Sequence, residues 1–103
     1  MAALNNYAFL VKHKSYNPDN QNVVLKSSDF YTAIFGVANV DDAVSVIKKL
    51  ADEGIQLVEL CGGFTEDEKN IIKKEIKNIV PIGLVKLDNE DVELLEFNLR
   101  EKN

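Results

Sequence analysis

An apolar segment runs directly into a glycine pair and a helix start at residues 55–68, which read Ile55-Gln-Leu-Val-Glu-Leu-Cys61-Gly62-Gly63-Phe64-Thr65-Glu-Asp-Glu68. The apolar run 55–61 predicts a strand. Thr65 and Glu68 have the spacing of a capping box, in which each side chain accepts a hydrogen bond from the other residue's backbone N–H. We therefore expect a helix to begin at Thr65. A strand, a glycine turn and a helix in this order indicate the βα unit of an α/β domain.

A second βα unit precedes this one. Residues 30–37, Phe-Tyr-Thr-Ala-Ile-Phe-Gly-Val, are rich in aromatic and β-branched side chains and predict a strand. From residue 40 to residue 53 the apolar positions recur at intervals of three and four, which predicts a one-sided helix. Asn39 or Asp41 is placed to cap the start of this helix, and Gly54 is placed to end it.

The rest of the chain adds shorter segments. Residues 7–12 predict a first strand and residues 81–87 a further apolar run, whereas the Asn- and Asp-rich residues 15–22 predict a loop. Residues 23–28 suit either a short strand or a linking turn. Residues 92–99 suit either a last strand or a short helix.

These elements predict one α/β domain over residues 1–103, with a small, mostly parallel four- or five-stranded sheet built from βαβ units. If strands 30–37, 55–61 and 81–87 lie side by side, right-handed crossovers place both helices on one face. Strands 30–37 and 81–87 are apolar on both sides, so something must cover the other face. The C-terminal segment, the Asn-rich loop and a second copy are the alternatives. We favour the copy, in a two-fold homodimer, because so large an apolar face is costly to leave in water.

The composition excludes several classes of function. Twelve Lys and Arg against seventeen Asp and Glu give a net charge of −5, which disfavours nucleic acid as a partner. The chain has neither the basic flank and apolar stretch of a secretory signal nor a run long enough to cross a membrane, so we expect a cytoplasmic protein without a membrane partner. One cysteine and one histidine exclude an intramolecular disulfide and a Cys/His metal cage within one chain. We expect no metal and no cofactor.

The candidate site lies where strand 55–61 ends. Ligands of open α/β sheets bind beyond the carboxyl ends of the strands, where glycines allow close approach. Glu59 and Cys61, two residues apart on a strand, share a face. The predicted ligand-binding residues are Glu59, Cys61, Gly62, Gly63, Phe64, Lys12 and His13.

Glu59 and Cys61 are also the two candidates for a catalytic role. In the functional interpretation Cys61 is a reactive thiolate and Glu59 an acid, a base or a ligand-binding group. In the structural interpretation Cys61 is a small buried apolar side chain, and Glu59 pairs with a backbone group or with the side chain of Lys12, His13 or Lys86. The acids at positions 66–68 oppose both a thiolate and a bound phosphate, and they favour the structural interpretation.

The motif Glu59-Leu-Cys-Gly-Gly-Phe64 resembles that of a family of small bacterial α/β proteins that carry a domain of unknown function. The resemblance covers residues 30–88. It includes the helix end at Asp52-Glu-Gly54 and the segment Pro81-Ile-Gly-Leu-Val85.

The chain departs from the family pattern in two places. Thr65 stands where the family has Gly, and residues 86–91, Lys-Leu-Asp-Asn-Glu-Asp, replace an Arg-Phe-Asp segment followed by His-Pro-Gly. If that segment carries an activity, this chain lacks it. The resemblance implies an α/β fold and supports the position of the pocket, but it implies no reaction.

Three functions follow as hypotheses. The first is a homo-oligomeric small-molecule binding or regulatory module, with a pocket at residues 59–63 for a small polar metabolite. The second is a small enzyme of isomerase or lyase type that uses Cys61 or Glu59. The third is a structural subunit whose uncovered sheet face binds a partner.

Overall fold

A mixed five-stranded sheet forms the centre of the molecule, with strand order β2-β3-β1-β4-β5. The computed structural model describes residues 3–102. Its elements are β1 (Asn6–Lys12), β2 (Asn22–Lys26), β3 (Tyr31–Val37), α1 (Val40–Asp52), β4 (Leu57–Leu60), α2 (Glu66–Glu75), β5 (Ile82–Leu84) and α3 (Asn89–Lys102).

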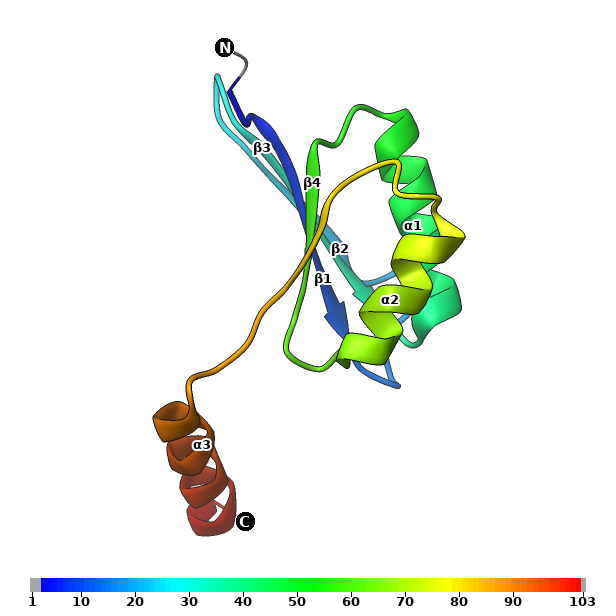
Figure 1. The fold of residues 1–103 in the computed structure, drawn as a ribbon. Helices are drawn as coiled ribbons and strands as arrows, with labels where there is room; N and C mark the ends of the chain where they lie inside the picture. The colour runs from blue at the N-terminus through cyan, green and yellow to red at the C-terminus, as the bar shows by residue number, and fades with distance from the viewer. Residues whose placement is uncertain (1–2, 103) are drawn as a thin grey trace.

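The sheet confirms the predicted fold class. β1, β3, β4 and β5 run parallel, and β2 pairs antiparallel with β3. Figure 1 shows α1 and α2 together on one face of the sheet. The crossovers β3-α1-β4 and β4-α2-β5 both advance in the same direction along the sheet, so the right-handed rule puts both helices on that face.

The strand order differs from the side-by-side arrangement assumed from the sequence. β1 lies between β3 and β4 and pairs in parallel with both. The N-terminal strand is therefore the centre of the sheet, and the first crossover passes over it. Of the two ambiguous segments, residues 22–26 form a strand and residues 89–102 form a helix.

The helix boundaries follow the local signals. Asn39, not Asp41, caps α1, because its side chain accepts a hydrogen bond from the N–H of Asp42 at 2.9 Å. Gly54 follows the end of α1 with φ 99°, a left-handed conformation that favours glycine. The capping box of Thr65 and Glu68 is present at the start of α2.

The core lies between the sheet and the two helices. Its largest fully buried side chains are Leu10, Val37, Ile47, Leu50, Val58, Leu60, Ile72 and Ile76. On β1 and β4 the buried residues alternate with partly exposed ones, as expected for strands covered on one face only. On α2, Ile72 and Ile76 are buried whereas Ile71 is exposed.

The other face of the sheet, called the open face below, has no helix over it in the described chain (Figure 1). Alternation along the strands assigns to it the side chains of Tyr7, Phe9, Val11, Val23, Leu25, Ile34, Leu57 and Glu59. The loop between β1 and β2 reaches over part of this face, where the ring of Tyr16 lies against Gly36. The expectation of an uncovered apolar face therefore matches this arrangement.

Candidate functional site

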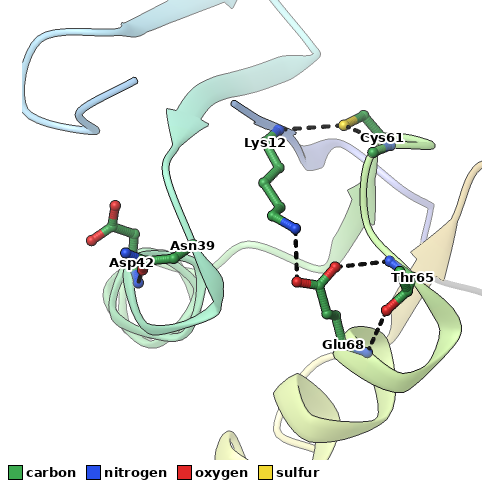
Figure 2. A network of polar contacts seen from close by, with 7 residues as sticks. Lys12, Asn39, Asp42, Cys61, Thr65 and Glu68 are labelled. Carbon is green, nitrogen blue, oxygen red and sulfur yellow. Dashed lines mark hydrogen bonds and ion pairs between the residues drawn. The ribbon is translucent and has the colours of Figure 1, made fainter. Parts of the chain in front are cut away.

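Cys61 lies at the carboxyl edge of the sheet, where the parallel strands end. Its Sγ accepts hydrogen bonds from the backbone N–H of Lys12, at 3.3 Å, and of Gly63, at 3.4 Å. The N–H of Cys61 itself donates to the carbonyl of Leu10 at 3.0 Å. The sulfur thus accepts the hydrogen bond from Lys12 where the pairing of β1 with β4 ends, as Figure 2 shows. Its second hydrogen bond, from Gly63, stabilises the turn that follows β4. The side chain is partly exposed and packs against the core.

Glu59 lies on the open face, and its partner is a tyrosine. The hydroxyl of Tyr7 donates to Oε1 of Glu59 at 2.5 Å. Burial, then the hydrogen bond to Glu59 and its negative charge, raise the pKa of Tyr7 to about 12. Gly83 on the neighbouring strand leaves room for the carboxylate, since an added Cβ there would lie 3.3 Å from Cγ of Glu59. The expected pairing of Glu59 with Lys12, His13 or Lys86 was wrong.

The ammonium group of Lys12 is bound to α2. Its Nζ lies 2.7 Å from Oε2 of Glu68 and 5.7 Å from the centroid of the Phe64 ring. The hydrogen bond from Lys12 keeps the pKa of Glu68 below its ordinary value, and the N–H of Thr65 adds to this effect. Figure 2 shows Glu68 between Lys12 and Thr65. The end of the central strand is thereby tied to the first turn of α2.

His13 follows β1 and turns toward the loop. Its Nδ1 lies 2.7 Å from Oγ of Ser15 and accepts the backbone N–H of Ser15 at 3.1 Å. Its ring packs at a tilt against Tyr16, with 5.7 Å between the centroids. Both contacts organise the loop after β1.

A hollow of about 710 Å³ opens beside the glycine turn. Residues 62–64 form one wall, the chain segment 84–87 a second, and the start of α3 a third. Its lining comprises Gly62, Gly63, Phe64, Glu66, Leu84, Val85, Lys86, Leu87, Val92 and Leu95. Of the predicted site residues, Gly62, Gly63 and Phe64 line it, whereas Glu59, Cys61, Lys12 and His13 do not. Glu59 and Cys61 therefore do not meet in this hollow.

Sequence reasoning missed two walls of this hollow. Leu84, Val85 and Leu87 belong to the apolar run after Pro81, and Val92 and Leu95 belong to the C-terminal segment. The signal that was available is parallel pairing: β5 pairs with β4, so the two strand exits must lie side by side. No local pattern placed the start of α3 there.

The hollow has a charged border. Nζ of Lys86 lies 2.8 Å from Oε2 of Glu66, and Nζ of Lys69 lies 3.6 Å from Oε1 of the same residue. The hydrogen bond from Lys86 is the main reason that the pKa of Glu66 is lowered. A ligand bound at this border would contact both the cation of Lys86 and the anion of Glu66, which form an ion pair with each other.

Residues 3–102 contain neither a cluster of side chains suited to a metal ion nor a helix suited to cross a membrane. In that range, no three side chains of His, Cys, Asp or Glu come together in a way that could hold a metal ion. No helix within the same residues combines the length and the apolar character needed to cross a membrane.

A model of the DUF6506 family, a family of unknown function, matches residues 5–97. The chain belongs to this family. The resemblance to a family of unknown function is thereby confirmed, while the bacterial distribution of DUF6506 and the role of Glu59-Leu-Cys-Gly-Gly-Phe64 as its signature stay predictions. The comparison with solved structures gave no match.

The chain also has a distant similarity to one relative with a named activity. The tRNA (cytidine(56)-2'-O)-methyltransferase of Nitrosopumilus maritimus (strain SCM1) is 28% identical over 85 residues, which cover 81% of this chain and 48% of that protein. The chain thus spans about half the length of this curated relative.

Proposed function

We propose that this DUF6506 chain is a small-molecule binding or regulatory module that works as a homo-oligomer and takes its ligand in the hollow beside residues 62–64. The observation that carries the proposal is the position of that hollow. It lies beyond the carboxyl ends of β4 and β5, the edge at which open α/β sheets bind ligands. Its volume of about 710 Å³ falls within the range of small-molecule sites, roughly 300–1,000 Å³.

The lining indicates the chemistry of the ligand. Phe64, Leu84 and Leu95 are apolar, and the charged groups lie at the border. Apolar walls with a few polar groups favour a ligand with an apolar body and one charged or polar end. We therefore propose an amphipathic metabolite, less polar than the one expected from the sequence.

The start of α3 supports a regulatory role. Val92 and Leu95 line the hollow together with residues 84–87, so a ligand there contacts both the body and the C-terminal helix. A ligand that contacts both parts stabilises the arrangement in which they lie close together. Occupancy of the hollow is thereby coupled to the position of α3.

A fluorescence titration with 1-anilinonaphthalene-8-sulfonate tests this proposal, because the dye combines aromatic rings with one negative charge. We expect saturable binding that Val85→Trp weakens at least tenfold, since the larger side chain fills the hollow. The matched control is Ile79→Trp, which changes another exposed apolar residue, 55% exposed against 43% for Val85, between α2 and β5 and outside the lining. It should bind the dye as the wild type does.

A third variant separates the hollow from the open face, which is also apolar. Ile34→Lys places a charge on the open face and should leave dye binding unchanged. If Ile34→Lys abolishes binding and Val85→Trp does not, the dye binds the open face, and the hollow is not the ligand site.

The second candidate function is enzymatic, and the similarity to a methyltransferase favours it. Binding of tRNA by this chain alone is opposed by its net charge of −5. Neither Cys61 nor Glu59 lines the hollow, so neither is placed to act on a ligand bound there. Alkylation of Cys61 distinguishes the candidates: reaction at neutral pH as fast as that of a free thiol favours an enzyme, whereas inertness until unfolding removes the nucleophile.

A further inference from the structure

A straight row of side chains crosses the open face. Val23 lies opposite Ile34, Ile34 opposite Phe9, and Phe9 opposite Glu59 on β4. Three of these four side chains are apolar. Val23 is 51% exposed, and Leu25, further along the same strand, is 59% exposed. The apolar half of this face, over β2, β3 and β1, therefore meets solvent in the single chain.

The helix α3 is the second apolar surface without cover. It stands away from the body at the end of an extended segment (Figure 1). All residues from 85 to 101 are exposed. A helix of 14 residues is close to the roughly 12–15 residues below which an isolated helix is marginal in water. Packing against another surface is what such a helix needs in order to be stable.

The apolar residues of α3 lie on two opposite sides. Val92 and Leu95, three residues apart, share one side, and Leu94 and Phe97 share the other. The first side lines the hollow with residues 84–87 of the same chain. The second side is free for another surface: Leu94 is 55% and Phe97 50% exposed. A helix that is apolar on two sides is suited to lie between two partners.

We propose that the Leu94–Phe97 side of α3 docks on the open face of a second copy of the chain. In a two-fold dimer the α3 of each copy lies on the open face of the other copy. This one kind of contact covers both the exposed side of α3 and the open face. The same exchange explains why one short chain carries both surfaces. It deepens the homo-oligomeric part of the proposed function and rests on it, but it does not require that the hollow bind a ligand.

The dimensions of the two surfaces agree. A helix of 14 residues is about 21 Å long at 1.5 Å per residue. The outer strands of a five-stranded sheet lie about 19 Å apart at 4.8 Å per strand. One α3 therefore spans the open face.

The open face also offers a socket. A hollow of about 290 Å³ lies beside Tyr16 and includes Val23 and Ile34 in its lining. Phe97 is the one aromatic residue of α3. An aromatic side chain that fills a pocket is a frequent anchor of protein interfaces.

The helix is better placed to dock on a second copy than on its own sheet. Val92 and Leu95 face residues 84–87 of their own chain across the first hollow. If α3 folded back over its own open face, Val92 and Leu95 would leave the lining of that hollow. Docking on a second copy keeps it and uses the opposite side of the helix.

The area suggests a dimer that dissociates on dilution. A helix of this length, about 10 Å wide, has a flat footprint on the order of 200 Å². A two-fold dimer has two such contacts, and each buries a footprint on the helix and another on the sheet. The total buried surface is roughly 800 Å², below the 1,200 Å² or so at which stable interfaces begin. We therefore expect a concentration-dependent equilibrium, in which α3 loses helicity as the dimer dissociates.

Crosslinking between separately prepared chains tests the contact. With Cys61→Ser in both, Leu94→Cys is introduced in one chain and Ile34→Cys in a second chain that carries an affinity tag. Under mild oxidation the mixture should form the mixed disulfide at least ten times faster than either chain forms a disulfide with itself. The contact is overturned if Leu94→Cys crosslinks mainly with itself, which indicates that two α3 helices pack together. It is also overturned if a chain with both cysteines closes at a rate independent of concentration.

Sedimentation velocity gives an independent measurement on the full-length chain. Leu94→Glu, on an exposed helix outside the core, should raise the dissociation constant at least tenfold while the body stays folded. Ile71→Glu is the matched control, an exposed apolar residue of α2 away from both surfaces, and should change nothing. A wild type that is monomeric at all concentrations contradicts the homo-oligomer itself. A dimer unchanged by Leu94→Glu contradicts only this interface, and neither result decides whether the dye binds in the hollow.

Discussion

Lys12 and Glu68 join the last residue of the central strand to the first turn of α2. Nζ of Lys12 lies 2.7 Å from Oε2 of Glu68, and the two side chains are 25% and 22% exposed. The other carboxylate oxygen, Oε1, accepts the N–H of Thr65 at 2.9 Å and completes the capping box. Each oxygen of Glu68 thus has a separate partner, so the ion pair and the cap can be removed one at a time.

Glu68→Gln should lower the free energy of unfolding at neutral pH by about 0.5–1 kcal/mol, the usual magnitude of a partly exposed ion pair. Glutamine also fits the capping box, so the helix start is kept. Urea unfolding followed by circular dichroism measures the change. Thr65→Ala is the contrasting variant, because it removes the cap and leaves the ion pair, at a cost of about 1 kcal/mol. No loss in Glu68→Gln means that the ion pair contributes nothing to stability.

The contribution of Glu68 should depend on pH. Its pKa in the folded state lies below the ordinary value of 4.5, chiefly because of the hydrogen bond from Lys12. A carboxyl group of this kind stabilises the fold fully above the unfolded pKa, and the stabilisation is lost as the pH falls through the folded pKa. The difference in unfolding free energy between wild type and Glu68→Gln should therefore shrink below about pH 4.5. A difference that stays constant down to pH 3 or so contradicts this assignment.

The hydrogen bond between Tyr7 and Glu59 should stabilise the fold at neutral pH and lose this effect at high pH. The pKa of Tyr7 is raised from 10.0 to about 12 in the folded chain, mainly by burial and then by Glu59. Its stabilising effect is fully present below pH 10 and is lost as the pH rises through the folded value. Tyr7→Phe should cost about 1 kcal/mol at neutral pH, and the cost should decline toward pH 12 or so.

A spectroscopic titration checks the same assignment directly. The late component of phenolate absorbance in the wild type should be absent from Tyr7→Phe and should move to lower pH in Glu59→Gln, where the negative charge is gone. If the late component persists in Tyr7→Phe, it belongs to another tyrosine.

Local patterns were sufficient for most of the fold. The period of the apolar residues predicted α1, and the Thr65–Glu68 spacing predicted the start of α2, because both signals depend on neighbours within one helical turn. The central position of β1 was not predictable in this way. It depends on pairing between residues such as Phe9, Ile34 and Glu59, which are far apart in the sequence.

The candidate site was predictable only in part, because local sequence signals located its glycine turn but not the residues brought there by strand pairing. The glycine turn at residues 62–64 lies at the strand end where the motif indicated a pocket, and it lines the hollow. The partner of Glu59 was missed because Tyr7 reaches it only through the pairing of β1 with β4. Charge alone had suggested lysine or histidine as the partner.

Two small replacements of Cys61, by alanine and by serine, should differ in their effect on the free energy of unfolding. Cys61→Ala leaves the N–H groups of Lys12 and Gly63 without the sulfur acceptor, and the loss should be about 1–2 kcal/mol. Cys61→Ser keeps an acceptor at this position and should lose less. Chemical unfolding of the two variants side by side measures the difference. Equal losses would falsify the acceptor role and leave only the volume of the side chain as the cause.

Gly36 and Tyr16 predict a steric coupling at the edge of the open face. A Cβ added to Gly36 would lie 2.5 Å from Cδ2 of Tyr16 and 3.0 Å from Cβ of Gln21. Because Cδ2 is close to the root of the ring, the whole side chain must move, and Gly36→Ala should cost about 1–3 kcal/mol. In a Tyr16→Ala background the same change should cost clearly less, since the close contact with the ring is gone. A double-mutant cycle from urea unfolding gives the coupling energy. Additive losses would show that the ring moves aside freely, and the socket proposed for Phe97 beside Tyr16 would then have no fixed wall.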